Sequence, residues 1–332
     1  MTNTLAVAES NGPSASRSPA VRPAVRRLAR MDVAFDTAIA GTVWIVLAIF
    51  VCIFAVLVDG AWPAMRQFGP GFVVRSGWDP VHLRFGALPF IVGTVLVALG
   101  AMVIAGGIGL LTAVCMTELL PRWLQAPVAY LIELLAFIPS VVYGLFGLLV
   151  LAPLLQTVVQ PWLLDHLGPY FDVFNGPPYG VGYLCATLIL ALMLVPLIVA
   201  LAREALLLVP NSQKQGALAL GATRWSVVWH VTLPYARNGI LGGIILALGR
   251  ALGETMAVAM TIGGGYHLPT TLMDQGYTLA SVIANEFNEV SSDTYLSALI
   301  YCGLILFVLT LGVNVIAYIS IRRLAGARGF KA

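Results

Sequence analysis

The sequence predicts an all-α membrane protein with six transmembrane helices. Three observations support this prediction. Hydrophobic residues make up 59% of the 332 residues and charged residues only 10%, whereas a soluble domain carries about 25% charged residues. Six apolar runs are each long enough to cross a bilayer, which takes about 20 residues. Lys and Arg are distributed unevenly among the segments that join these runs.

The first 30 residues form a segment rich in Ser, Pro, Ala and Arg that ends in a basic cluster. It lacks the apolar core of a cleaved signal peptide near its start. We therefore expect residues 1–30 to be a disordered cytoplasmic tail. Residues 31–332 are expected to form one six-helix transmembrane domain with its core at 87–320.

Polar segments with turn-forming residues separate the predicted spans, for example QFGPGF, FNGPPYG and NEVSSD. The second and third spans are long enough to tilt or to extend beyond the hydrocarbon. The predicted spans are 37–58, 87–116, 125–155, 182–208, 237–262 and 295–320.

Basic residues predict the orientation of the spans, because Lys and Arg are enriched in cytoplasmic segments. With both termini in the cytoplasm, the outer segments contain only Arg66, Arg75 and Arg84, and Arg250 lies within a span. The cytoplasmic segments then contain Arg17, Arg22, Arg26, Arg27, Arg30, Arg122, Arg203, Lys214, Arg224, Arg237, Arg322, Arg323, Arg328 and Lys331. We predict a multi-pass protein of the plasma (inner) membrane, in contact with lipid.

The sequence carries no pattern of a metal site or an enzyme. The four cysteines lie in apolar runs without a CxxC pair, and the four histidines lack ligand spacing such as HExxH. No GxxxxGK[ST] phosphate cradle occurs. We expect no metal, no cofactor and no nucleic-acid partner for this chain.

Residues 209–235 form a loop between the fourth and fifth spans that is too amphipathic to cross the membrane. QKQGALALGATRW predicts a short helix broken at Gly221, and SVVWHVTL a second helix that stops at Pro234. Its exposed apolar side chains would be Leu218, Leu220 and Trp225. Such a helix is suited to a groove on another protein, and a helix in the lipid headgroup plane is the alternative.

The stretch LGRALGETMAV places Arg250 and Glu254 inside the fifth span. On a continuous helix they would lie one turn apart on one face and pair, since an unpaired charge in hydrocarbon costs about 3 to more than 10 kcal/mol. Gly249 and Gly253 would let a neighbouring helix approach closely. A guanidinium matches an oxyanion, so we interpret the pair as part of an anion path. The alternative is a buried ion pair that fixes helix register.

The stretch FIPSVVYG is the second polar feature within the spans. Pro139 removes a backbone donor, which predicts a kink and a freed carbonyl near Ser140 and Tyr143. The two hydroxyls either line the path or belong to a packing kink. Glu133 lies near the cytoplasmic end of its helix, where it either lines the path, extends its carboxylate to the membrane surface or pairs with a basic residue.

The 209–235 loop resembles the EAA loop of ABC-importer permeases, which runs Glu-Ala-Ala, three residues, Gly, nine residues, Ile, one residue, Leu-Pro. This chain has Gln215, Gly216 and Val231 where the pattern has Glu, Ala and Ile, and it keeps the spacing. In that family the loop forms a coupling helix seated in a cleft of an ATPase subunit. The resemblance therefore implies ATPase coupling by Gln215, Ala217, Leu218, Gly221, Ala222, Thr223, Leu233 and Pro234.

Four further stretches resemble PstC-type permeases of high-affinity phosphate importers: FGALPFIVGTVLVAL, IELLAFIPSVVYGLFGLLVLAPLL, LGRALGETMAV and TLASVIANEF. The resemblance runs from about residue 37 to the C-terminus. It implies a MetI-like type I permease fold and phosphate passage at Arg250 and Glu254. The implied partners are a PstA-type second permease, two PstB-type ATPase subunits that bind ATP and Mg, and an extracytoplasmic PstS-type phosphate-binding protein.

Three alternative functions remain open at this point. The chain is compatible with a permease of another oxyanion ABC importer, a secondary transporter or a structural membrane subunit. Secondary transporters typically contain internal repeats, and 37–155 shows no convincing repeat of 182–320.

Overall fold

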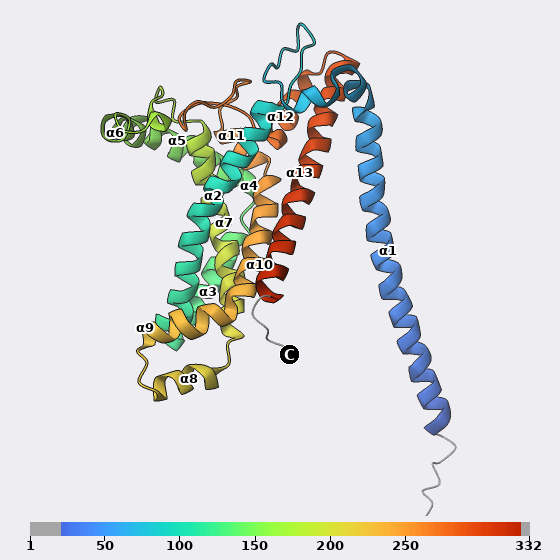
Figure 1. Cartoon of the computed structure of the whole chain (residues 1–332), viewed down its shortest axis with the longest axis vertical. Helices are drawn as coiled ribbons and strands as arrows, with labels where there is room; N and C mark the ends of the chain where they lie inside the picture. The colour runs from blue at the N-terminus through green and yellow to red at the C-terminus, as the bar shows by residue number, and fades with distance from the viewer. Residues whose placement is uncertain (1–20, 327–332) are drawn as a thin grey trace, which may run out of the picture. The chain divides into compact units, whose positions relative to one another are not determined.

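The computed structural model describes residues 21–326, and this part of the chain is almost entirely helical (Figure 1). The long helices are α1 (Val21–Phe68), α2 (Leu88–Val114), α3 (Arg122–Ala136), α7 (Tyr183–Leu207), α10 (Leu233–Leu252) and α13 (Asp293–Gly326). The short helices are α4 (Ser140–Phe146), α5 (Ala152–Leu154), α6 (Gln160–His166), α8 (Asn211–Ala219), α9 (Arg224–Val227), α11 (Met256–Thr261) and α12 (Leu279–Glu286).

Short turns of other helix types connect several of these elements. A π-helical turn extends α2 over Cys115–Leu119. Two more connect α4 to α5 (Gly147–Leu151) and α5 to α6 (Leu155–Val159). A fourth connects α9 to α10 (Val228–Thr232). The 3₁₀ turns are Gly69–Val73, Asp172–Phe174 and Phe287–Glu289.

Six described segments are long and apolar enough to cross a membrane, which confirms the predicted number of spans. They are Phe35–Val73, Leu88–Leu119, Ser140–His166, Tyr183–Leu207, Arg224–Leu252 and Asp293–Arg322. The bounds of the first and sixth segments enclose the predicted runs, and those of the second and fourth agree with the predicted runs to within three residues. The third and fifth differ, because each predicted run contains a break.

The chain divides into two compact units, Met1–Ala55 and Val56–Ala332. The division falls inside α1 rather than after residue 30. Because α1 begins at Val21, residues 21–30 of the predicted disordered tail are helical, in keeping with their content of the good helix formers Arg, Ala and Leu. The rest of that predicted tail, residues 1–20, lies outside the described residues.

Helix α7 forms the centre of the second unit. It packs against α2, α3, α10 and α11, and side chains such as Ile189, Leu190 and Leu194 are fully buried. A helix that is apolar all round is buried, and the run YLCATLILALMLVPLIVALA has this character.

The predicted third span is broken at Pro139. Helix α3 ends at Ala136 and α4 starts at Ser140, because the proline ring has no N–H and clashes with the carbonyl four residues earlier. That carbonyl belongs to Leu135, and it accepts a hydrogen bond from the Tyr143 hydroxyl at 2.9 Å. The prediction of a freed carbonyl close to Tyr143 is confirmed, but the kink is a full break.

The predicted fifth span is broken at 253–255. Helix α10 ends at Leu252 with Gly253 at its C-cap, and α11 starts at Met256. Pro234 was predicted to stop the preceding helix, but this was wrong. It lies in the first turn of α10, directly after the π-helical turn Val228–Thr232, and the helix continues past it.

The second unit has two ends, which we name by their helices. The α8 end carries α8 and α9, and the α12 end carries the 69–87 loop and α12 (Figure 1). Helix α2 runs from one end to the other, beginning at the α12 end. Its first turns contact α12, since the Thr94 hydroxyl accepts a hydrogen bond from the Leu279 backbone N–H at 2.9 Å.

We expect a Gly93→Ala substitution to lower the free energy of unfolding by about 1–3 kcal/mol, the usual cost of overpacking. A Cβ at Gly93 would collide with the Tyr277 carbonyl oxygen, which is backbone and cannot rotate away. Gly107→Ala is the matched control, because it lies on the same helix with open space around it. Thermal unfolding in detergent measures the difference, and equal midpoints for both variants would contradict the packing at Gly93.

Candidate functional site

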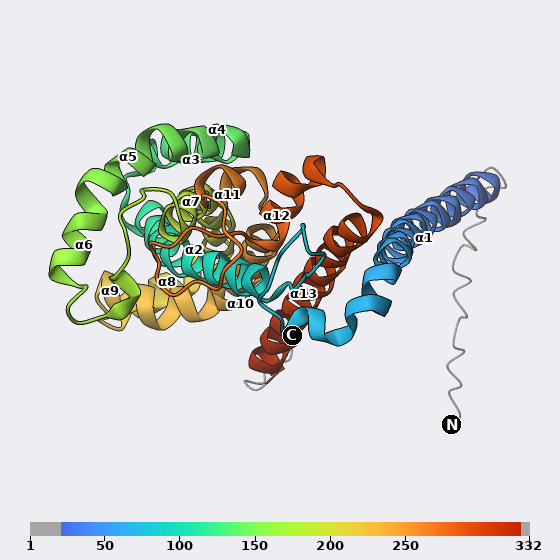
Figure 2. The ribbon, with the colours of Figure 1, turned by 90° about the horizontal axis from the view of Figure 1, so that it is seen from above.

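The two broken spans lie side by side, as Figure 2 shows for α4 and α11. A Cβ at Gly144 would lie 2.7 Å from the Met260 sulfur and 3.2 Å from the Ala257 Cα. The close contact therefore brings the second halves of both spans together. Tyr143 belongs to the same buried cluster as Leu252 and Ala257, on either side of the second break.

Arg250 lies in the last turn of α10, and its side chain is exposed. The ion pairs within 4.0 Å among the described residues are Asp79–His82 and Glu118–Lys214. Within that part of the chain, the Arg250 guanidinium therefore has no acidic partner.

Glu254 lies beyond the end of α10 and is partly buried. Its Oε1 accepts a hydrogen bond from the Ala257 backbone N–H at 3.4 Å, so it caps the start of α11. The predicted Arg250–Glu254 pair is wrong for this conformation. Its premise was a continuous helix, whereas the helix stops before Gly253, a residue of low helix propensity.

The predicted close approach at the glycines is confirmed at Gly249. A Cβ there would lie 3.1 Å from the side-chain oxygen of Asn314, which belongs to α13. A Cβ at Gly253 would have only the backbone carbonyl oxygens of α10 itself within 4 Å, at 3.9 Å. This glycine therefore ends the helix and does not make room for a neighbouring helix.

The other predicted path residues differ in their surroundings. Ser140 is partly exposed at the first residue of α4. Tyr143 is buried, and its hydroxyl donates a hydrogen bond to the backbone carbonyl of Leu135. This bond connects the two helices on either side of the break. Glu133 is exposed on α3 and takes part in no ion pair of the described residues, so the alternative in which it pairs with a basic residue is not seen there. The path role of all three stays a prediction.

The first part of the loop between the fourth and fifth spans folds as the sequence predicts, whereas its second helix continues through the π-helical turn into α10. Helix α8 is followed by Gly221, whose φ of +85° lies in the left-handed region that favours glycine. Thr223 then caps α9, its hydroxyl accepting a hydrogen bond from the Ser226 N–H at 3.2 Å. The turn separates two short helices at the α8 end.

The apolar side chains of this loop are exposed, as predicted. Leu218 is 45% exposed, Leu220 90% and Trp225 55%. Large exposed apolar side chains grouped together indicate a contact surface. The other residues with a predicted coupling role are exposed or partly exposed: Gln215, Ala217, Gly221, Ala222, Thr223, Leu233 and Pro234.

The sequence reasoning missed a buried carboxylate at the α12 end. Glu286 is only 4% exposed, and it accepts hydrogen bonds from the hydroxyls of Tyr266 (2.7 Å), Tyr277 (3.2 Å) and Tyr295. Burial and the hydrogen bond to Glu286 raise the pKa of Tyr266. The GGGY segment (263–266) that follows α11 is thus tied to α12 through Tyr266.

We expect Glu286→Gln to lower the free energy of unfolding by about 1–3 kcal/mol, because the amide nitrogen cannot accept a hydrogen bond and leaves a tyrosine hydroxyl unpaired. Glu289→Gln, exposed three residues later, is the control with the same chemical change. Unfolding midpoints of the two variants in detergent test this, and an unchanged Glu286→Gln midpoint would contradict a tethering role.

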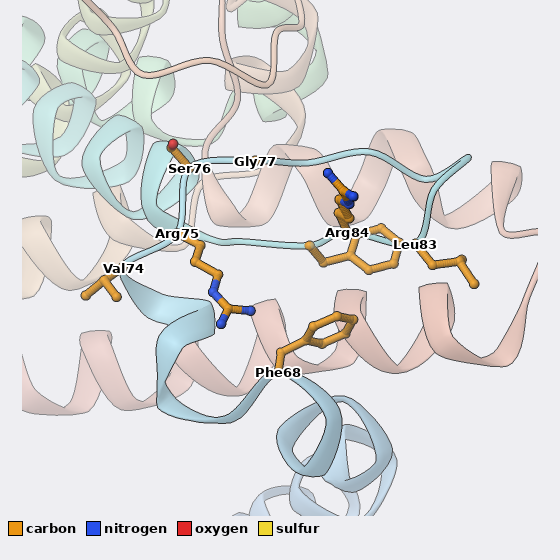
Figure 3. Close-up of a pocket in the computed structure, with 8 residues that line it drawn as sticks. Phe68, Val74, Arg75, Ser76, Gly77, Leu83 and Arg84 are labelled. Atoms are coloured by element: carbon orange, nitrogen blue, oxygen red, sulfur yellow. The ribbon is translucent and has the colours of Figure 1, made fainter.

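A pocket of about 540 Å³ lies in the 69–87 loop (Figure 3). Arg75 and Arg84 line it together with the rings of Phe68 and Phe85. In Figure 3 the Arg75 guanidinium lies near the Phe68 ring. Neither arginine takes part in an ion pair of the described residues. The α12 end therefore presents two unpaired positive charges.

Six candidate membrane spans, a charged residue at a helix break and an exposed short helix at one end are the features of a helical membrane transport protein. The chain belongs to the family of binding-protein-dependent transport system inner membrane components, whose model matches residues 105–326.

Individual relatives extend this match to most of the chain. It is 43% identical over 306 residues to the phosphate transport system permease protein PstC of Xylella fastidiosa, covering 91% of this chain and 94% of the relative. It is 42% identical over 318 residues to the protein of the same name from Mesorhizobium japonicum, covering 94% and 97%.

Solved structures support the fold. One chain of a bacterial alginate ABC transporter, solved with an alginate-bound periplasmic protein, matches with a TM-score of 0.59 at 17% identity, covering 89% of this chain and 97% of that one. A second structure, a bacterial ABC transporter that imports alginate, matches with a TM-score of 0.53 at 16% identity, covering 84% and 96%. The predicted permease architecture is thus confirmed.

Proposed function

We propose that this chain is the permease subunit of an ATP-driven phosphate importer of the plasma (inner) membrane, with the α8 end and both termini in the cytoplasm. The observation that carries the proposal is the similarity to phosphate permeases over 94% of this chain at 42% identity. A permease of another oxyanion importer is the alternative.

Arg250 supports passage of an anion. An unpaired arginine that faces lipid costs about 3 kcal/mol or more at the centre of the bilayer. Its exposed side chain therefore faces water or protein in the assembled importer, and the natural candidate is a path shared with a second, PstA-type permease. Its planar fork of donors binds two oxygens of a phosphate group at once.

Glu254 supports selection of phosphate over sulfate. Glu254 lies in the break between α10 and α11, just after Arg250. Its carboxylate accepts hydrogen bonds and cannot donate them. Phosphate near neutral pH keeps a proton to donate, whereas sulfate has none. The carboxylate therefore tolerates the first anion and repels the second.

The two ends of the second unit fit two different partners. At the α8 end, the exposed Leu218, Leu220 and Trp225 suit a groove of a PstB-type ATPase dimer, which would bind ATP and Mg. At the α12 end, Arg75 and Arg84 suit an acidic surface of a PstS-type phosphate-binding protein. Closure of the ATPase dimer then moves the spans between outward and inward openings.

We expect the double variant Arg75→Glu, Arg84→Glu to slow association with the phosphate-binding protein about tenfold or more at low salt, since complementary charge mainly sets the association rate. The difference should shrink as salt screens exposed charges. Surface plasmon resonance over a salt series measures it, with Arg66→Glu as the control outside the pocket. Equal rates at every salt concentration would contradict docking at this pocket.

Reconstituted transport tests the proposed function. The permease is assembled with its second permease, ATPase and binding protein in liposomes, and uptake of labelled phosphate and sulfate is followed with and without ATP. We expect ATP-dependent uptake of phosphate alone. Preferred uptake of sulfate would establish the other oxyanion importer, and uptake without ATP would establish a secondary transporter.

A further inference from the structure

Helix α8 is attached weakly to the rest of the protein. None of its residues is buried, and its backbone is connected through Pro210 on one side and the left-handed Gly221 on the other. Beyond α9 and the π-helical turn Val228–Thr232, which follow it in the chain, it has few neighbours. A helix with so few apolar contacts cannot pass on a displacement through packing alone.

One side-chain contact fixes α8 to a spanning helix. The Lys214 Nζ lies 2.6 Å from Oε1 of Glu118, and the side chains are only 18% and 17% exposed. The other described ion pair, Asp79–His82, is local and has side chains 44% and 72% exposed. Screening by solvent is therefore weaker at Lys214–Glu118, and breaking it leaves a charge in a partly buried position.

Glu118 lies in the π-helical turn Cys115–Leu119 that ends α2. Helix α2 packs along α7 over its length, and its other end is tied to α12 by the Thr94–Leu279 hydrogen bond. The segment after α11 is tied to α12 by Tyr266 and Glu286. A continuous set of bonded elements thus leads from α8 to the α12 end.

We propose that the Lys214–Glu118 ion pair is the strut that transmits movement of α8 to α2, so that ATP hydrolysis and opening of the path occur together. This inference rests on the proposed function, in which α8 contacts the ATPase. The two residues are positioning residues for coupling, and they touch neither phosphate nor ATP.

Charge exchange in the complete reconstituted importer tests the strut. The variants are Lys214→Glu, Glu118→Lys and the double exchange, with Lys214→Arg as the conservative variant. The readout is phosphate transported per ATP hydrolysed, together with the amount of ATPase that co-purifies. We expect each single variant to keep its ATPase and to lower the ratio about tenfold, within the usual range of coupling between sites. The double exchange and Lys214→Arg should return it to within about twofold of the unmodified importer.

Two outcomes would overturn the strut. One is an unchanged ratio in both single variants. The other is a double exchange that transports no better than the single variants, whether or not the ATPase remains bound, because a true pair is restored by exchange. Failure of the unmodified importer to take up phosphate with ATP would instead overturn the proposed function, so the two failures are distinguishable.

Discussion

Phosphate uptake by an importer carrying Arg250→Lys is expected to fall about 10- to 100-fold, with the complex still assembled. Lysine keeps the charge but loses the planar fork that binds two phosphate oxygens, and a hydrogen bond to a charged group is worth about 1.5–3 kcal/mol. The structure strengthens this expectation, because the guanidinium is exposed and lacks an acidic partner within the described chain. It is therefore available to an anion without first releasing Glu254.

Initial rates of uptake in proteoliposomes measure the effect. Arg66→Lys is the matched control, since this arginine lies in the last turn of α1, with its guanidinium carbon 4.9 Å from the centre of the Trp62 ring, and belongs to neither broken span. Uptake by Arg250→Lys equal to that of the control would remove Arg250 from the path and leave it a role in assembly only.

The ATPase is expected to dissociate from an importer carrying Leu218→Asp or Leu220→Asp. An exposed leucine that fills a groove typically contributes about 2 kcal/mol or more when it is a central contact, which corresponds to about 30-fold in affinity. A carboxylate in the same groove adds the cost of burying a charge. Leu220, 90% exposed, is expected to show the larger loss.

Co-purification of the ATPase through a tag on this chain measures that loss. Asn238→Asp, exposed on α10 near the same end, adds the same charge outside α8 and should retain the ATPase. If the leucine variants kept it too, α8 would be a helix of the lipid headgroup plane rather than a coupling helix.

Much of the fold followed from apolar run length and from proline and glycine. The apolar run around Leu190 predicted a membrane span over 182–208, and Gly221 predicted the turn between α8 and α9. The break at 253–255 was not predicted, because apolar character continues across Gly253 and periodicity alone cannot distinguish one helix from two. The false Arg250–Glu254 pair was a direct consequence.

Contacts between distant parts of the chain were beyond sequence reasoning. Lys214 and Glu118 are separated by 96 residues, and each taken alone has the character of a solvated charge near a membrane surface. Glu286 lies in a motif that the sequence analysis singled out, but its three tyrosine partners come from different segments. A single sequence has no signal that joins such residues.

The structure of the assembled importer with phosphate bound, determined by electron cryomicroscopy, tests the central claim most directly. The claim is that Arg250 lies on the path between two permeases and binds the passing anion. We predict a water-filled passage next to the guanidinium, with oxyanion density about 3 Å from its nitrogens. An Arg250 side chain that faces lipid, or that is sealed off from any passage between the subunits, would contradict it.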